Sequence, residues 1–307
     1  MSGSVYTFAS FSRGESLGFR LGGPGLGNLL FPWARSVSFA KRHELQRINS
    51  TWRTVKLGPI LRGEFDKRFY SDMFKEHEIG GINKFLLLNT SRKVAESDAK
   101  DILQTKSHGT KVVVFSGMEG LFEAILDDSE IIKKELLKMV LPHHKEQAEK
   151  FDSDGICVHI RMGDFTVAEN EDIIRQGAWN YRLPMKWYVD IVNRLRSEAG
   201  YDIEVNIFSD GTDEDLAEIL KLPNTRRRFY GSAIADMLAL SRSRLLIASA
   251  STFSMWASYL GRMPTIWFPG THRQKLYKEE EAFEGEIDYG EPFPSSLIET
   301  IKKESAH

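Results

Sequence analysis

The sequence predicts an α/β protein whose carboxyl-terminal domain is a parallel sheet with helices on both faces. Apolar segments typical of buried strands recur along residues 155–268, and segments with apolar residues at helical spacing separate them. Strands that alternate with helices pair in parallel, and the helices then cover both faces of the sheet. The carboxyl ends of such strands meet at one edge, where these folds bind ligands. We therefore expect a ligand site at that edge.

The amino-terminal half has a weaker pattern, which we interpret as a first domain over residues 1–150. The predicted elements are a strand at 16–21, a glycine-rich turn at 22–28, a helix at 29–43, a buried strand at 111–115 and an amphipathic helix at 129–141 that Pro142 ends. The polar segment 143–154 is the best candidate for a linker. A second domain is therefore expected over 151–307.

The second domain shows strands and helices in regular alternation. Pro184 begins a helix that places Trp187 and Ile191 on its apolar face. The other helices are predicted at 213–221, 233–243 and 252–261. Strands are predicted at 155–160, 204–208, 244–250 and 265–268, with a short one at 229–230.

The composition is that of an ordinary globular protein and excludes several classes. Of the 307 residues, 41% are hydrophobic and 27% are charged, which argues against wholesale disorder. The net charge of −2 disfavours binding to nucleic acid through bulk positive charge, so no nucleic-acid partner is expected. The single cysteine, Cys157, can form neither an intrachain disulfide nor a cysteine-based zinc site.

The sequence shows no signal for membrane insertion. No stretch of about 18 apolar residues is present, so no integral membrane segment is expected. The first residues, MSGSVYTFASFSRGES, lack the charged start and the apolar core of a signal peptide. We therefore expect a cytoplasmic protein. A protein from which an amino-terminal anchor had been removed would show the same features.

Polar clusters follow three of the predicted strands. Because each cluster lies where a parallel sheet presents its ligand edge, we expect the clusters to lie close together. They are His159, Arg161 and Asp164 after the first strand, Ser209 and Asp210 after the second, and Ser251, Thr252, Phe253 and Ser254 after the strand at 244–250.

Arg161 is the most informative of these residues. An arginine at the end of an apolar strand needs an anionic partner, and its planar guanidinium suits a diphosphate. A structural ion pair with Asp164 or Asp210 would explain it equally well. Segment 251–254 offers backbone N–H groups and hydroxyls that suit an anion, although capping of the following helix is the simpler interpretation.

Asp236 and His159 each allow two interpretations. Asp236 lies in an otherwise apolar helical segment, IADMLALS, where its carboxylate could accept hydrogen bonds from N1 and N2 of a guanine. The alternative is a solvated position on the helix surface. His159 alternates with apolar residues along its strand, which is also typical of a core histidine.

Two motifs that suggest cofactors fail on inspection. The glycine-rich turn does not continue to the third glycine of a dinucleotide fingerprint, because Asn28 and Leu30 occupy those positions. A nicotinamide-dependent oxidoreductase is therefore disfavoured, although the turn would still allow close approach of a ligand. Asp152 and Asp154 have the spacing of a metal motif but precede their strand, where turn formation is expected.

Four segments, taken together and in this order, carry a resemblance to a known family. They are GGPGLGNLLFPWARSVSFAKR (22–42), VHIRMGDF (158–165), LPMKWYVDIV (183–192) and DMLALSRSRLLIASASTFSMWASYLG (236–261). This set resembles the α1,2-/α1,6-fucosyltransferase and protein O-fucosyltransferase superfamily, and within it the α1,2-fucosyltransferases most closely. The sequence departs from the family pattern at Leu29, Met162 and Met255, which affects the expected acceptor and the strictness for fucose more than the GDP-sugar.

The resemblance implies a GT-B-like architecture, with two Rossmann-like domains facing a cleft. The first domain would be the acceptor side and the second would bind a GDP-sugar, with no metal and no other cofactor. The residues implied at the donor are Arg161 at the β-phosphate, His159 and Asp210 beside it, Asp236 at the guanine, Ser251, Thr252, Phe253 and Ser254 around the pyrophosphate, and Gly25, Gly27 and Asn28 from the first domain.

The expected function follows from the same resemblance. An inverting glycosyltransferase would move L-fucose from GDP-fucose to a hydroxyl of an oligosaccharide or lipid-linked glycan, α1,2-linked to galactose. A lipid-linked acceptor would make the protein peripheral to a membrane. Arg161 and Asp164 are the expected catalytic residues, and the choice of general base between Asp164 and Asp210 stays open. The alternatives are transfer of another GDP-sugar and GDP-sugar binding without catalysis.

Overall fold

The computed structural model divides the chain into two compact units, Met1–Pro142 and His143–His307, here called the amino-terminal and carboxyl-terminal units. The sequence placed this boundary after residue 150. The structure describes residues 4–12, 15, 18–21, 23–55, 70, 72–104, 108–152, 155–277 and 282–302. Among them, no helix has the length and hydrophobicity that a membrane crossing requires.

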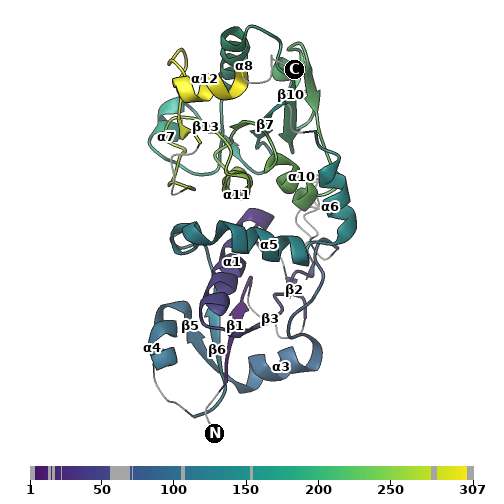
Figure 1. Ribbon diagram of the computed structural model, residues 1–307, viewed down its shortest axis with the longest axis vertical. Coiled ribbons are helices and arrows are strands. Elements are labelled where there is room, and N and C mark those ends of the chain that lie inside the picture. Colours follow the sequence, from purple (N-terminus) through teal and green to yellow (C-terminus); the bar gives the residue numbers. More distant parts are fainter. Residues whose placement is uncertain are drawn as a thin grey trace. The chain divides into compact units, whose positions relative to one another are not determined.

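The amino-terminal unit contains a parallel sheet with the strand order β3-β1-β6-β5 (Figure 1). Its strands are β1 (Val5–Ala9), β3 (Gln46–Ile48), β5 (Arg92–Ala95) and β6 (Lys111–Phe115). The strand predicted at 111–115 is therefore confirmed. A separate parallel pair joins β2 (Arg20–Leu21) to β4 (Thr54–Val55).

Helix α1 (Leu26–Arg42) packs on β1 because one side of it is apolar over its whole length. Helix α5 (Ser129–Met139) contacts α1. Both were predicted to within a few residues. The shorter helices are α3 (Gly81–Thr90), α4 (Ala99–Gln104), and the 3₁₀ turns η2 (Glu96–Asp98) and η3 (Glu123–Asp128).

The segment expected as a linker is largely helical. Helix α6 spans Pro142–Glu149, so Pro142 begins a helix as well as following one. A proline is well tolerated in the first turn, where its missing N–H would have no partner in the helix. His144 of this helix is buried and its Nδ1 lies 2.9 Å from Oγ of Ser232 in the carboxyl-terminal unit.

The sheet of the carboxyl-terminal unit is parallel throughout, with the order β11-β10-β7-β12-β13-β14. This confirms the predicted fold class for this half. The strand predicted at 244–250 is much shorter than expected, and the one predicted at 229–230 lies earlier. The strands are β7 (Ile156–Ile160), β10 (Val205–Ser209), β11 (Thr225–Arg227), β12 (Leu246–Ile247), β13 (Thr265–Trp267) and β14 (Glu284–Glu286).

Helices cover both faces of this sheet. Apolar residues of α8 (Met185–Ala199), α9 (Ala217–Leu220) and α12 (Ser295–Lys302) share one core with Ile156, Val158 and Ile160 of β7, and α8 lies beside α12 (Figure 1). On the other face, α10 (Ala233–Leu240) packs against α11 (Thr252–Gly261), which reaches His159 through Ser254. The remaining elements are α7 (Glu171–Arg175) and the pair β8 (Thr166–Val167) and β9 (Tyr181–Arg182).

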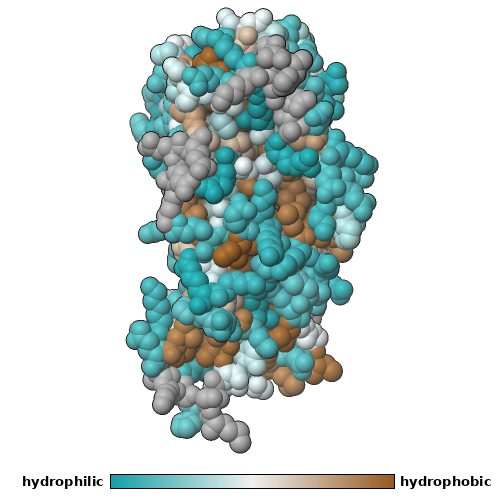
Figure 2. All heavy atoms as spheres, in the orientation of Figure 1, coloured by the Kyte–Doolittle hydropathy of each residue, from teal (hydrophilic) through white to brown (hydrophobic). Residues whose placement is uncertain are grey.

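Most of the visible surface is hydrophilic (Figure 2). Hydrophobic side chains reach the surface over α3, where Ile82, Phe85 and Leu86 are exposed. They lie at helical spacing on one side of α3.

Candidate functional site

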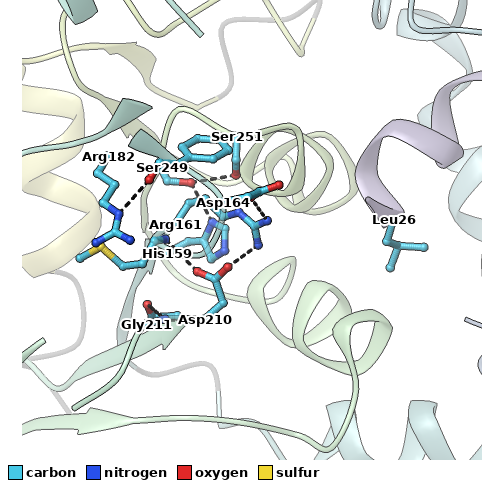
Figure 3. Close-up of polar contacts among 12 residues, drawn as sticks. Leu26, His159, Arg161, Asp164, Arg182, Asp210, Gly211, Ser249 and Ser251 are labelled. Atoms are coloured by element: carbon cyan, nitrogen blue, oxygen red, sulfur yellow. Dashed lines mark hydrogen bonds and ion pairs between the residues drawn. The ribbon is translucent and has the colours of Figure 1, made fainter. Parts of the chain in front are cut away.

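Strand β7 positions the candidate site because it lies between β10 and β12 in the sheet. All five of its residues are buried, which explains why the strand is apolar apart from His159. Arg161 follows its last residue and emerges at the carboxyl edge. Figure 3 shows the side chains of Arg161, Asp164 and Asp210 pointing toward one another there.

The guanidinium of Arg161 is held by two carboxylates. Its NH2 lies 2.6 Å from Oδ1 of Asp164, and its NH1 lies 2.5 Å from Oδ2 of Asp210. The guanidinium also lies over the ring of Phe165, 5.5 Å from its centroid. A guanidinium has five N–H groups, so two ion pairs leave it able to bind a further anion. The structural ion pair and the ligand role, posed as alternatives, are therefore compatible.

Asp210 contacts the backbone as well as Arg161. Its second oxygen, Oδ1, accepts a hydrogen bond from the backbone N–H of Met162 at 2.8 Å. The side chain of Asp164 is 46% exposed, against 23% for Asp210. Asp210 therefore links the arginine to the backbone after β7, whereas the side chain of Asp164 is the more exposed to solvent.

Two glycines allow the loops after β7 and β10 to approach each other. A Cβ on Gly163 would overlap the carboxylate of Asp210, and a Cβ on Gly211 would lie 2.8 Å from Cγ of Met162. Any larger residue would push these loops apart and move Asp210 away from Arg161. The backbone N–H of Gly211 donates to Oγ of Ser209 at 3.0 Å, which closes the second turn.

His159 points to the opposite face from the apolar residues of β7 and contacts the start of α11. Its Nδ1 lies 2.7 Å from Oγ of Ser254 and 3.0 Å from Oγ of Ser249, and its ring stacks on Phe253. Burial lowers the pKa of the imidazole to about 4; the carboxylate of Asp210 opposes this effect in part. His159 is therefore neutral at pH 7 and acts through hydrogen bonds.

The start of α11 is built from serines. Oγ of Ser251 accepts a hydrogen bond from the backbone N–H of Ser254 at 3.3 Å, so the predicted helix cap is present. Thr252 and Phe253 follow it and are partly exposed. The amino terminus of a helix carries a partial positive charge and favours an anion there, so capping and anion binding are again compatible.

Ser249 joins these groups and was not among the predicted site residues. Its Oγ lies 2.8 Å from Oγ of Ser251 and 3.0 Å from Oγ of Ser254, and it also contacts His159 (Figure 3). The sequence placed Ser249 inside a strand at 244–250, but β12 ends at Ile247. The sequence signal that could have identified Ser249 was a serine near the end of an apolar segment.

Asp236 lies in the first turn of α10, the helix that packs against α11. Its Oδ1 accepts a hydrogen bond from the backbone N–H of Tyr230 at 2.7 Å, and the residue is half-buried. One carboxylate oxygen therefore holds the preceding loop. The role of Asp236 toward a guanine stays a prediction.

Gly25, Gly27 and Asn28 lie together in the amino-terminal unit, at the start of α1. Gly25 is the N-cap of α1 and has no side chain to cap it. The backbone N–H of Leu26 donates to the hydroxyl of Tyr70 at 3.0 Å, and Asn28 is half-buried. Their expected contact with a donor stays a prediction.

The comparisons with known proteins identify the family. The model of glycosyl transferase family 11 matches residues 115–286, which is more than half of the chain and includes the whole Arg161 cluster. The chain belongs to glycosyl transferase family 11. No curated protein sequence gives a significant match.

Solved fucosyltransferase structures share the fold of this family 11 glycosyltransferase. The structure of selenomethionine-labelled fucosyltransferase NodZ from Bradyrhizobium is 14% identical, with a TM-score of 0.51, over 86% of this chain and 94% of that one. The structure of NodZ α1,6-fucosyltransferase co-crystallised with GDP gives the same identity and TM-score over 86% and 95%. The predicted resemblance to the fucosyltransferase superfamily is thereby confirmed at the level of family and fold.

The site of the family 11 enzyme offers oriented donors. Among the described residues, no group of three or more histidine, cysteine, aspartate and glutamate side chains is arranged to hold a metal ion. The predicted turn at Asp152–Asp154 lies partly outside the described residues. Arg161, the hydroxyls around Ser249 and the start of α11 lie at the carboxyl edge of the sheet, and all three are donors of the type that binds anionic groups.

Proposed function

We propose that this glycosyltransferase transfers L-fucose from GDP-fucose to a hydroxyl of a glycan, with inversion and without a metal ion. The observation that carries the proposal is the guanidinium of Arg161, fixed by Asp164 and Asp210 at the end of β7. Family membership supports the reaction type. The choice of donor is supported by fold neighbours whose structures contain GDP or were soaked with GDP-fucose.

The chemistry requires positive charge at the departing phosphate. When the bond from the sugar carbon to the β-phosphate oxygen breaks, its electron pair leaves with GDP, and the sugar becomes oxocarbenium-like. Donors that are already oriented toward that oxygen stabilise the developing charge without reorganisation. Arg161 supplies a full charge, and the start of α11 supplies a partial one. These groups could do the work of a metal ion.

His159 has a different role in this proposal. Since burial holds its pKa near 4, it adds no positive charge at neutral pH. Its Nδ1 faces Ser249 and Ser254, and Phe253 stacks on its ring. We expect it to fix the start of α11 relative to β7, so that the phosphate donors keep their positions.

The acceptor hydroxyl must lose a proton as it attacks the sugar carbon. Asp164 is the better candidate for the base because its side chain is 46% exposed, against 23% for Asp210. Asp164→Asn should change the dependence of kcat on pH, whereas Asp210→Asn should lower kcat at every pH. If both variants leave the profile unchanged in shape, neither residue is the base.

The first experiment is calorimetric binding of GDP, GDP-fucose, GDP-mannose and UDP-galactose in the presence of EDTA. We expect the GDP compounds to bind and GDP-fucose to be hydrolysed slowly. An Asp236→Ala variant should weaken the preference for GDP over UDP. If no GDP compound binds, the polar clusters are structural and the proposal fails.

The acceptor is the finer part of the proposal. An α1,2 link to galactose rests on the motif resemblance, and product analysis by NMR after incubation with galactosides tests it. A cytoplasmic location would suit an oligosaccharide or a lipid-linked glycan. A product linked elsewhere would overturn the linkage and leave the donor assignment intact.

A further inference from the structure

The amino-terminal unit contains a pocket of about 310 Å³ that the sequence did not predict. It lies beyond the carboxyl end of β3, the edge at which parallel sheets bind ligands. Its floor includes the buried residues Thr51, Trp52, Phe74 and Lys84. Its volume is within the range of small-molecule sites, about 300–1,000 Å³.

Lys84 places a positive charge at the floor of this pocket. The residue is only 7% exposed, and its Nζ donates to Oγ1 of Thr51 at 2.7 Å. Burial lowers the pKa of its ammonium group, and the carboxylates of Glu15 and Glu76 oppose this effect. Burial raises the pKa of Glu15 to about 7, so Glu15 carries only part of a negative charge at neutral pH. The charge of Lys84 is therefore incompletely balanced by Glu15.

The rim of the pocket adds to this positive charge. Arg53, Lys75 and Glu76 are exposed and line the opening. With Lys84, the lining contains three cationic side chains and one carboxylate. An anionic ligand is therefore favoured over a neutral or cationic one.

The remaining lining suits a sugar ring. The rings of Trp52 and Phe74 lie 4.2 Å apart and form an apolar wall. Such walls pack against the C–H groups of a ligand, while a few polar groups fix its orientation. Glu76 and Thr51 also line the pocket, and their side-chain oxygens are acceptors for hydroxyl groups.

We propose that this pocket binds an anionic pyranose unit of the glycan acceptor. The proposal rests on the proposed function, because it assigns the substrate class of the acceptor. A carboxylate, as in a hexuronate, and a phosphate ester offer the same chemistry to Lys84, Arg53 and Lys75. The two sources are separated by the experiment.

The test is calorimetric binding to the full chain, without donor, of a glucuronate-containing disaccharide, a hexose phosphate and a neutral disaccharide. We expect at least one of the acidic sugars to bind about tenfold or more tightly than the neutral one, and the tighter of the two identifies the charged group. Binding should weaken as salt is raised, since the rim charges are exposed. If neutral and acidic sugars bind equally, or neither acidic sugar binds, the inference is wrong.

Rim variants test the pocket without disturbing the core. Arg53→Gln and Lys75→Gln should each weaken the binding of the acidic sugar by about two- to fivefold, which is the effect expected for the loss of a single exposed charge pair. Lys93→Gln, an exposed lysine on β5 outside the pocket, is the matched control and should bind like the unaltered chain. Lys84→Met should reduce the affinity for the acidic sugar more than the rim variants do. If Lys84→Met does not fold, the rim variants alone decide the test. Rim variants that bind like the control would overturn the proposal.

The same preparations separate this inference from the proposed function. GDP binding should be unchanged in Arg53→Gln and Lys75→Gln, because neither residue is among those assigned to the GDP site. If GDP binds but acidic sugars do not, the pocket inference fails alone. If acidic sugars bind and GDP does not, the donor assignment fails, and the pocket is a sugar site of another activity.

Discussion

Replacement of Arg161 tests the candidate site most directly. The guanidinium is 23% exposed and makes two ion pairs, so its loss should cost the fold about 0–1 kcal/mol for the more exposed pair with Asp164 and about 1–2 kcal/mol for the half-buried pair with Asp210. The loss of one preorganised donor to a developing negative charge typically raises the barrier by about 3–4 kcal/mol. The effect on catalysis should therefore exceed the effect on stability. We expect Arg161→Ala to lower kcat by about 10²–10³-fold.

The chain offers a closely matched control for this variant. Arg175 is 28% exposed, pairs with Glu171 and Asp288, and lies over the ring of Phe268 at 4.9 Å. Arg175→Ala therefore removes a similar set of contacts at a position outside the site.

The assay is GDP release from GDP-fucose, with kcat, KM and melting temperature measured for both variants. Arg161→Lys should fall between the unaltered chain and Arg161→Ala, because it keeps the charge but loses the planar fork. Near-normal turnover in Arg161→Ala would refute the reasoning. An equal loss in Arg175→Ala would show that the effect is structural.

The other predictions concern two buried titratable groups and one close backbone contact. Glu15 has a pKa raised from 4.5 to about 7, so the folded state should lose about 3 kcal/mol as pH rises from 4.5 through 7; Glu15→Gln should remove this loss in urea denaturation series. His159 has a pKa lowered from 6.5 to about 4, so stability should fall by about 3 kcal/mol as pH drops through that window, and the decline should be absent in His159→Gln. Gly163→Ala should displace Asp210 and lower kcat by up to about 100-fold with little change in melting temperature, and normal activity would contradict the close packing.

The sequence predicted the centre of the carboxyl-terminal sheet well because the strands β7, β10, β12 and β13 are buried. Such strands read as continuous apolar runs that stand out from the helices between them. The apolar run at 244–250 predicted a strand that is too long. Strand β12 ends at Ile247, and Ser249 then contacts His159. An apolar segment does not reveal at which residue its backbone stops pairing with the neighbouring strand. Ser249 was therefore missed although its neighbours were found.

The amino-terminal unit was harder to predict for a different reason. Strand β1 is a short run at the chain start, VYTFA, with residues that favour strands, and it was not recognised. The pocket of this unit is lined by Thr51, Glu76 and Lys84, which lie far apart in sequence. No spacing rule brings such residues together. The fold of the unit brings them together beyond the carboxyl end of β3.

The two proposed sites differ in how they attract an anion. Arg161, Asp164 and Asp210 carry a formal charge of −1 together, so a diphosphate gains nothing there from net charge and must be held by oriented donors. The pocket around Lys84 has an excess of cations at an exposed rim and attracts an anion at longer range. Oriented, partly buried donors are screened much less by salt than exposed charges are. Donor binding should therefore depend weakly on ionic strength and acceptor binding strongly. A net charge of −2 over the whole chain is compatible with both, because neither site depends on the total.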